Sequence, residues 1–200
     1  HAINIKETAF NQTAWYNSQP NGLVYIGKIV YKYKGTMPAN TSISILDGTL
    51  GISCYAFRYC PGLTNLSIPD SVTTIGEGAF DNTAWYNNQP NGLIYIGKIA
   101  YKYKGYMPVN TTISLLTGTT IIADYAFFNC ANLKSIDIPS SVTNINYHAF
   151  YGCSSLTSVN IPSSVTKIGA AAFGNCIGLT NITIPNSVIN IGLGAFENCT

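Results

Sequence analysis

Seven Ala-Phe dipeptides recur along this chain, and the interval between neighbours is always 23 or 47 residues. A fixed period of about 20 to 50 residues is typical of repeat architectures, in which each unit buries its apolar face against the next. We therefore expect a stacked solenoid, with an insertion in each long interval. The phenylalanines are Phe10, Phe57, Phe80, Phe127, Phe150, Phe173 and Phe196.

Composition narrows the classes of partner. A solenoid grows by adding coils, so residues 1–200 are expected to form a single domain. Only 9% of residues are charged and the formal net charge is +2, which argues against nucleic acid. No apolar run reaches the roughly 18 to 20 residues that span a bilayer, so no direct membrane insertion is expected. The first residues match only the second half of a repeat, and the last repeat is followed by no further strand or polar cap. We therefore expect a fragment of a longer protein, with caps, signal and anchor outside it.

The last three units share one strand pattern. Alternating residues such as Ile136 and Ile138 would lie on one face of a short strand, and Pro139, which lacks an N–H, would end it. Equivalent strands are expected before Pro162 and Pro185. Valine and isoleucine should then point inward from the return limb, as in Val142 with Ile145, Val165 with Ile168, and Val188 with Ile191.

A small residue stands three positions after each phenylalanine. At the ~4.8 Å spacing of stacked strands, neighbouring thiols could form disulfides, but inward-pointing cysteines more often act as small hydrophobes with weak hydrogen-bonding ability. No Cys-x-x-Cys pair exists, and neither His1 nor His148 falls into ligand spacing, so no metal or cofactor is predicted. This structural ladder consists of Thr13, Cys60, Thr83, Cys130, Cys153, Cys176 and Cys199.

The complete pattern, present at residues 156–176 and 179–199, is Leu-x-x-(Ile/Val)-x-Ile-Pro-x-Ser-Val-x-x-Ile-Gly-x-x-Ala-Phe-x-x-Cys. It resembles the BspA-like (Treponema-type) leucine-rich repeats. The resemblance implies a mainly β, curved right-handed coil with a short parallel sheet on its concave face. It also implies a surface-exposed or secreted protein of bacteria or some protists, often linked to adhesion. Leu46 and Leu116 at the proline position depart from the pattern, as do the insertions.

The insertions are near copies of each other. The blocks Ala14–Gly35 and Ala84–Gly105 differ at only three positions. Each contains two β-type segments around a Gly-Lys pair, which predicts inserted hairpins with a type II′ turn at about residues 14–35 and 84–105. The simplest register pairs Ile96 with Ile99, Tyr95 with Ala100, Ile94 with Tyr101 and Leu93 with Lys102. Each insert could instead form an extra coil, because its 24 additional residues are almost one repeat.

One face of each hairpin mixes aromatic and cationic residues. Amphipathic aromatics are common anchors at protein interfaces and also stack on sugar rings, so this face is the candidate ligand-binding surface. Packing is the competing interpretation, because an inserted hairpin must itself cover the solenoid. We favour packing for Trp15, Trp85, Tyr31 and Tyr101. The candidate binding residues are Tyr25, Lys32, Tyr33, Lys34, Tyr95, Lys102, Tyr103 and Lys104.

Other features of the sequence indicate structural roles and not catalysis or binding. Small polar residues flank the central residue of each predicted strand, as at Ser42 and Ser44, and indicate a solvated β-face. Eight acidic residues and two histidines form no catalytic motif, so no enzyme is expected. His148 occupies a position that Gly78 and Ala171 fill in other units, which indicates a variable surface site.

Two functions remain. The first is an extracellular or cell-surface binding module for a host matrix protein, a cell-surface protein or a glycan. It predicts exposed side chains at Tyr25, Tyr33, Tyr95 and Tyr103. The second is a structural spacer that displays another domain, for which the inserts would be fully packed.

Overall fold

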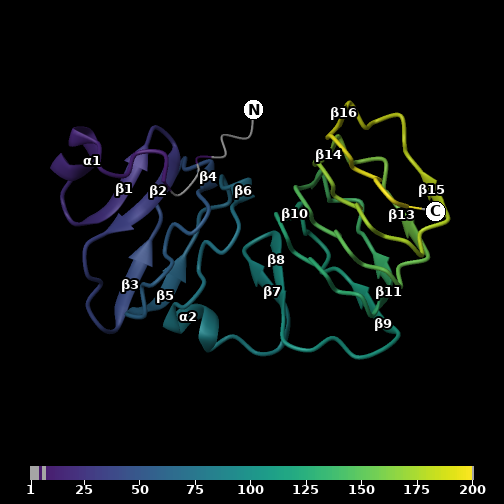
Figure 1. Cartoon of the computed structure of the whole chain (residues 1–200), viewed down its shortest axis with the longest axis horizontal. Coiled ribbons are helices and arrows are strands. Elements are labelled where there is room, and N and C mark those ends of the chain that lie inside the picture. The colour runs from purple at the N-terminus through teal and green to yellow at the C-terminus, as the bar shows by residue number, and fades with distance from the viewer. Residues whose placement is uncertain (1–4, 6–7, 200) are drawn as a thin grey trace. The chain divides into compact units, whose positions relative to one another are not determined.

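The computed structural model describes residue 5 and residues 8–199, so much of the partial repeat at the N-terminus, including Ile3, lies outside the described residues, as does Thr200. The chain is mainly β, as predicted, with short strands and two short helices among the described residues (Figure 1). It forms two compact units, His1–Gln89 and Pro90–Thr200, and each is described by itself. A single solenoid across both units stays a prediction.

The N-terminal unit combines one mixed sheet with a parallel strand pair. The sheet has the order β1-β2-β4-β6 and the pair is β3-β5. Its elements are α1 (Ala14–Ser18), β1 (Gly22–Ile26), β2 (Ile29–Lys34), β3 (Thr41–Ser44), β4 (Gly51–Ile52), β5 (Leu63–Ser67), β6 (Thr74–Ile75) and α2 (Ala84–Asn87).

The C-terminal unit repeats this plan with more coils. Its main sheet has the order β7-β8-β10-β12-β14-β16, and the parallel pairs are β9-β11 and β13-β15. Its strands are β7 (Gly92–Ile96), β8 (Ile99–Lys104), β9 (Thr111–Ser114), β10 (Ile121–Ile122), β11 (Leu133–Asp137), β12 (Asn144–Ile145), β13 (Ser158–Asn160), β14 (Lys167–Ile168), β15 (Asn181–Thr183) and β16 (Asn190–Ile191).

The strand predictions are confirmed on both limbs of the coil, except in the last coil, where Ile191 was predicted to point inward and is exposed. β11, β13 and β15 each end two residues before Pro139, Pro162 and Pro185, where the missing N–H stops the ladder. On the return limb, β6, β12 and β14 each end on an isoleucine that is completely buried, as at Ile145 and Ile168. Each coil therefore contributes one residue of each limb to a continuous core.

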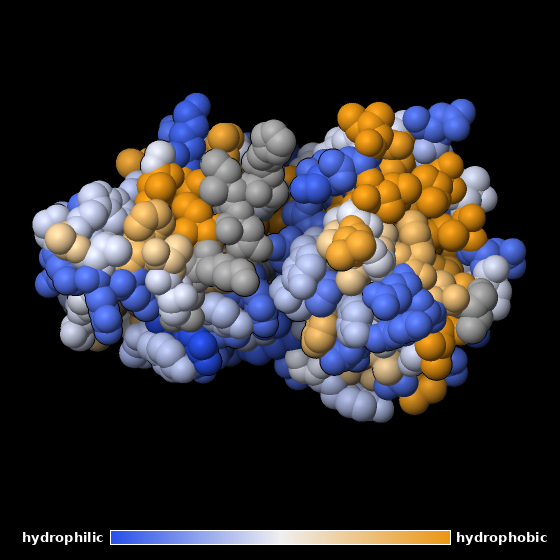
Figure 2. Space-filling view, turned by 45° about the horizontal axis from the view of Figure 1, so that its top comes forward, coloured by the Kyte–Doolittle hydropathy of each residue, from blue (hydrophilic) through white to orange (hydrophobic). Residues whose placement is uncertain are grey.

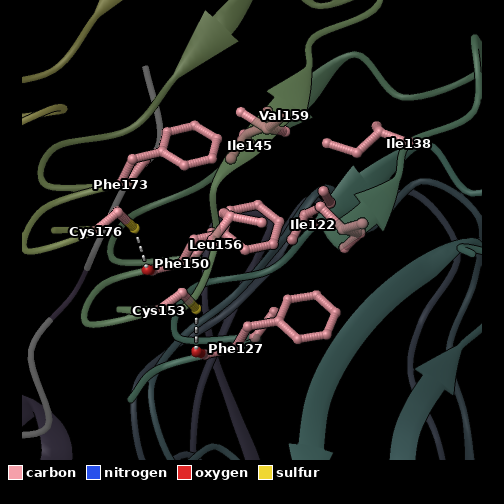
Figure 3. Packing of buried hydrophobic residues seen from close by; sticks show 14 of the residues in the cluster. Ile122, Phe127, Ile138, Ile145, Phe150, Cys153, Leu156, Val159, Phe173 and Cys176 are labelled. Atoms are coloured by element: carbon pink, nitrogen blue, oxygen red, sulfur yellow. Dashed lines mark hydrogen bonds between the residues drawn. The ribbon is translucent and has the colours of Figure 1, made fainter. Parts of the chain in front are cut away.

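The Ala-Phe dipeptides form the centre of that core. Phe127, Phe150 and Phe173 are fully buried, and successive ring centroids lie 5.1 and 5.0 Å apart with interplanar angles of 4° and 10° (Figure 3). The N–H of Phe150 donates to the carbonyl of Ala172 in the next coil at 2.7 Å. Alanine leaves room for this close backbone approach, while each buried ring contributes about 1.5 to 3 kcal/mol through removal from water.

The inserts form extra coils, which was the alternative that the sequence left open. The N–H of Tyr33 donates to the carbonyl of Ala56, and that of Tyr103 to Ala126, at 2.8 and 2.7 Å. Phe57, Phe127, Phe150 and Phe173 make the same bond to the alanine carbonyl of the next coil. Tyr33 lies 24 residues before Phe57 and Tyr103 lies 24 before Phe127, so residues 34–57 and 104–127 each form one coil of 24 residues.

The first strand of each hairpin covers the edge of that extra coil. β8 pairs in parallel with β10, and β7 pairs in antiparallel fashion with its other side. β2 lies in the same way between β1 and β4. β1 and β7 are therefore outermost strands of their two sheets.

The predicted hairpin register is right only near the turn. Gly97, with a φ of 54°, starts the turn as a type II′ geometry requires. Ile96 pairs with Ile99 and Tyr95 with Ala100, but a bulge beyond Tyr95 makes Lys102 the partner of Ile94 and Tyr103 the partner of Leu93. The bulge places one extra residue in β8, because β8 must also pair with β10.

The last coil exposes a core position that earlier coils bury, since Ile191 is exposed where Ile145 and Ile168 are buried. Ile189 and Leu193 are 86% and 91% exposed, at positions that earlier coils leave exposed or half-buried. Figure 2 shows hydrophobic surface gathered on the C-terminal unit. This exposure follows from stacking, since each coil buries its face only against a following one.

Candidate interaction surface

Two of the candidate tyrosines hydrogen-bond to the segment that follows strand β3 or β9, and so anchor each hairpin. Tyr25 and Tyr95 are half-buried. Their hydroxyl oxygens accept hydrogen bonds from the backbone N–H of Leu46 and Leu116, at 3.2 and 3.0 Å. These leucines replace the repeat's proline, so the tyrosine satisfies an N–H that proline would not have.

Tyr33 and Tyr103 take the place of the repeat's phenylalanine and are also half-buried. Tyr103 packs against the core of the C-terminal unit. Burial raises the pKa of the Tyr103 phenol, and a smaller contribution comes from Cys130. The prediction that these four side chains are exposed is therefore met only in part, because each divides its surface between packing and solvent.

Lys34 stabilises the end of helix α1. Its Nζ donates hydrogen bonds to the carbonyl oxygens of Tyr16, Asn17 and Gln19, and it lies 5.5 Å from the centroid of the Tyr16 ring. A cation at this position satisfies the free carbonyls of the helix end and complements its dipole. The contacts of Lys34 therefore indicate a structural role.

The other candidate lysines line the second strand of each hairpin. Lys32 lies opposite Val24 and Lys102 opposite Ile94, and Lys104 lies opposite Gly92. All three are half-buried. The hairpins therefore bring each set of candidates together along one strand, and ligand binding by these residues stays a prediction.

Two residues that were predicted to lie on the binding face are buried instead. Val30 and Ala100, which the simple hairpin register put on the same face as Tyr25 and Tyr95, are both completely buried. The reason is that β2 and β8 belong to the coil as well as to the hairpin, so both faces of these strands are covered at this point.

The packing interpretation is confirmed for Tyr31 and Tyr101, which are 1% and 2% exposed. It is met only in part for the tryptophans, because Trp85 is half-buried and Trp15 is 40% exposed. Trp15 lies 5.2 Å from Phe10, and Trp85 lies at the same distance from Phe80. Each tryptophan therefore covers the ring of the Ala-Phe dipeptide that precedes its helix.

Threonine replaces cysteine in the ladder where a helix follows. Thr13 and Thr83 are the N-caps of α1 and α2. The Thr83 hydroxyl donates to the carbonyl of Phe80 at 2.7 Å and accepts from the N–H of Tyr86 at 3.0 Å. A thiol is a weaker acceptor, so the change to threonine follows from the need for a cap.

The cysteines of the ladder are free thiols, and three of them hydrogen-bond to the preceding coil. Cys153, Cys176 and Cys199 donate from Sγ to the carbonyls of Phe127, Phe150 and Phe173, at 3.1 to 3.2 Å. Burial raises the pKa of Cys130 to about 12 and, despite a smaller opposing effect of Lys32, that of Cys60 to about 11. These thiols stay protonated at neutral pH and behave as packing groups.

A further aromatic group was missed by the sequence interpretation. His148 is half-buried among the rings of Tyr125, Phe128, Tyr147 and Tyr151. The available signal was the clustering of aromatic residues around positions 125–128 and 147–151, one repeat apart. The position is variable, as predicted, but here its variation builds a surface feature.

The described residues contain no group of three or more histidine, cysteine, aspartate or glutamate residues that could hold a metal ion, and His1 lies outside them. None of the helices in the described part of the chain has the length and apolar character to cross a membrane.

Comparison with known proteins gives matches over most of the chain. The model of the BspA type leucine rich repeat region matches in six copies, over residues 24–107 and 94–200. No curated protein matches the sequence.

Solved structures of repeat proteins are similar to this chain. A leucine-rich repeat protein of T. pallidum is 26% identical, with 86% of this chain and 59% of that one covered and a TM-score of 0.36. A leucine-rich cell surface protein of Faecalibacterium prausnitzii is 20% identical, with coverages of 91% and 75% and a TM-score of 0.37. The pneumococcal vaccine antigen PcpA is 17% identical, with coverages of 80% and 49% and a TM-score of 0.50. The chain spans less than two thirds of the T. pallidum protein and about half of PcpA.

Proposed function

This chain belongs to the family of BspA-type leucine-rich repeat proteins, and on that premise we propose that it is a non-enzymatic binding module, secreted or displayed on a cell surface. Its role in this proposal is adhesion to a host matrix protein, a neighbouring cell or a glycan. Repeat scaffolds of this kind present extended, regularly spaced surfaces to a partner, which suits binding better than catalysis.

The proposal rests on one observation: the fold packs its core with aromatic rings, yet other aromatic side chains lie on its surface. Tyr59, Tyr106, Phe128 and Tyr147 are 67%, 75%, 40% and 38% exposed. Tyrosine in particular is enriched at protein interfaces, because its ring buries a large area while its hydroxyl bonds to polar groups. A scaffold without a ligand has no need of such residues in its turns.

A structural spacer is the second candidate function. It is favoured by the contacts of the hairpin residues, since Tyr25 and Tyr95 bond to the backbone and Lys34 holds a helix end. In this function the inserts would serve only to start and cover each unit.

A binding screen distinguishes the two. The labelled protein is applied to immobilised extracellular matrix proteins and to a glycan array, and a binding module is expected to give saturable binding to at least one class. Saturable binding to neither class would overturn the proposal and leave the spacer.

Charge reversal then tests the hairpins. Lys32→Glu combined with Lys102→Glu changes the candidate strands, and Lys28→Glu combined with Lys98→Glu is a matched control in the exposed turns of the same hairpins. Lys34 is left intact because its loss would disturb α1. Weaker binding in the first variant alone assigns the ligand to the hairpin strands, whereas equal binding in both variants removes these strands from the proposal.

A further inference from the structure

The C-terminal unit carries a cluster of five rings outside its core. We call Tyr125, Phe128, Tyr147, His148 and Tyr151 the ring cluster. The imidazole of His148 is stacked on Tyr147 at 3.9 Å and on Tyr151 at 4.7 Å between ring centroids. Phe128 is stacked on Tyr151 at 5.5 Å, and Tyr125 meets Tyr147 edge-on at 5.4 Å.

These rings are held in fixed orientations. Asn175 donates from its side-chain nitrogen to the Tyr151 hydroxyl, and Asn198 donates to the Asn175 side-chain oxygen at 2.7 Å. The backbone N–H of Tyr147 donates to the carboxylate of Asp124 at 3.2 Å. Phe128 and Tyr147 are nevertheless exposed, so the cluster is ordered and still presents ring surface to solvent.

The backbone under the cluster is strained for the residues that occupy it. Tyr125 and His148 have φ values of 59° and 52°, and the equivalent positions of other coils hold Tyr55, Gly78, Ala171 and Gly194 at 58°, 58°, 48° and 62°. Glycine adopts this left-handed conformation without steric cost, whereas a bulky side chain there is an outlier. Strain of this kind concentrates at functional sites, which makes the cluster a candidate.

The duplicated N-terminal unit shows that the fold does not need four of these five rings, since only Tyr125 has an aromatic counterpart there, Tyr55. Shifted by 70 residues, Phe128, Tyr147, His148 and Tyr151 correspond to Arg58, Glu77, Gly78 and Asp81, while the Ala-Phe dipeptides are the same in both copies. In that unit Arg58 lies over the rings of Tyr55 and Tyr59, at 4.8 and 4.7 Å. The inserts differ at three positions in 22, so the two copies diverge in this surface far more than in their hairpins.

The chemistry of the cluster points to one class of ligand. Its five side chains carry no carboxylate, ammonium or guanidinium group, and they combine apolar ring faces with phenol hydroxyls and an imidazole. Such a surface suits a molecule with C–H faces and many hydroxyls.

We propose that the ring cluster is the binding surface for a neutral, extended glycan. This inference rests on the proposed binding function and gives it a place and a ligand class. The exposed rings of Phe128 and Tyr147 contact the C–H faces of the sugars, and the tyrosine hydroxyls bond to the sugar hydroxyls. Fixed rings lose little conformational entropy when they bind, which favours affinity.

The test uses neutral hexasaccharides as probes. Cellohexaose, laminarihexaose and mannohexaose are titrated into the whole chain, with polygalacturonate and immobilised matrix protein as the other ligand classes. The main variant carries the residues of the N-terminal unit, namely Phe128→Arg, Tyr147→Glu, His148→Gly and Tyr151→Asp. The fold already accepts these residues at the equivalent positions, and a second variant, Phe128→Ser, changes one exposed ring only.

At least one neutral hexasaccharide is expected to bind the native chain, with affinity reduced about tenfold or more in the main variant and unchanged in the Lys28→Glu, Lys98→Glu control. Circular dichroism checks that each variant is folded. Neutral glycan binding that survives both ring variants would overturn the inference and leave the binding function intact. Ring-dependent binding of polygalacturonate or matrix protein alone would overturn the glycan class, and no binding of any class would overturn the binding function itself.

Discussion

The Sγ of Cys176 donates a hydrogen bond to the backbone carbonyl of Phe150, 3.1 Å away and one coil earlier (Figure 3). The two residues are 26 positions apart, so the bond joins the turn of one coil to the ring position of the one before it. Cys153 makes the same contact with Phe127. Both thiols are completely buried, and each one fills space and satisfies a carbonyl.

Cys176→Ala should therefore destabilise the protein by about 1 to 3 kcal/mol, through the loss of a hydrogen bond and the creation of a small cavity. Urea denaturation measures the change. Cys54→Ala, at a half-buried cysteine outside the ladder, is the control and should cost less. An equal cost at both positions would show that the ladder contact contributes nothing specific.

The ladder thiols should also react slowly with alkylating reagents. Burial raises the pKa of Cys130 from its usual 9.0 to about 12, so the reactive thiolate is scarce at pH 8 in the folded protein. Mass spectrometry of the alkylated chain should show faster modification of Cys130 in denaturant. Equal rates in the folded and denatured chains would contradict the burial of this thiol.

The raised pKa of the Cys130 thiol also makes the stability of the folded protein depend on pH. The folded state favours the neutral thiol, so the contribution of Cys130 is complete below about pH 9 and is lost as the pH rises toward 12. The unfolding midpoint in urea should fall across this interval. Cys130→Ala should reduce the fall, since it removes the titrating group.

The repeat was predictable from sequence because its rules are local. The 23-residue period predicts the length of each coil, and the prolines predict where β11, β13 and β15 end. The role of Tyr33 was not predicted, because a hairpin pattern and a coil pattern overlap in the same residues and only the hydrogen bond to Ala56 distinguishes them. The burial of Ala100 was missed for the same reason.

The ring cluster was harder to predict than the fold. The contact of His148 with Phe128 and Tyr151 depends on side-chain directions across two coils, which the repeat period alone does not give. The candidate residues of the hairpins were easy to find by composition. Their contacts, such as that of Lys34 with α1, appear only in three dimensions.

Lys34→Met should loosen helix α1. The substitution keeps the aliphatic stem but removes the donors to Tyr16, Asn17 and Gln19, at a cost of about 1 kcal/mol. Hydrogen exchange should accelerate in residues 14–19. Lys28→Met in the exposed turn is the matched control, and the same acceleration there would contradict the helix-capping role.

Tyr95→Phe should cost about 0.5 to 1.5 kcal/mol, because the N–H of Leu116 loses its acceptor. The ring itself remains, so packing is preserved. Tyr106→Phe is the control, since Tyr106 is 75% exposed, and it should leave the unfolding midpoint unchanged. If the two variants unfold alike, the Tyr95 hydroxyl has no part in anchoring the hairpin.

Ala171 and Ala172 should respond in opposite directions to glycine. Ala171 has a φ of 48°, and the same position holds Gly78 and Gly194 in other coils, so Ala171→Gly removes backbone strain and should stabilise the protein by up to about 1 kcal/mol. Ala172 is completely buried beside Phe173, so Ala172→Gly removes a packed methyl group and adds freedom to the unfolded chain, which should cost about 1 kcal/mol. Urea denaturation of both variants gives the sign of each change. A loss of stability in Ala171→Gly as large as that in Ala172→Gly would mean that the left-handed turn imposes no strain on the residue it holds, and the argument from strain at His148 would fall with it.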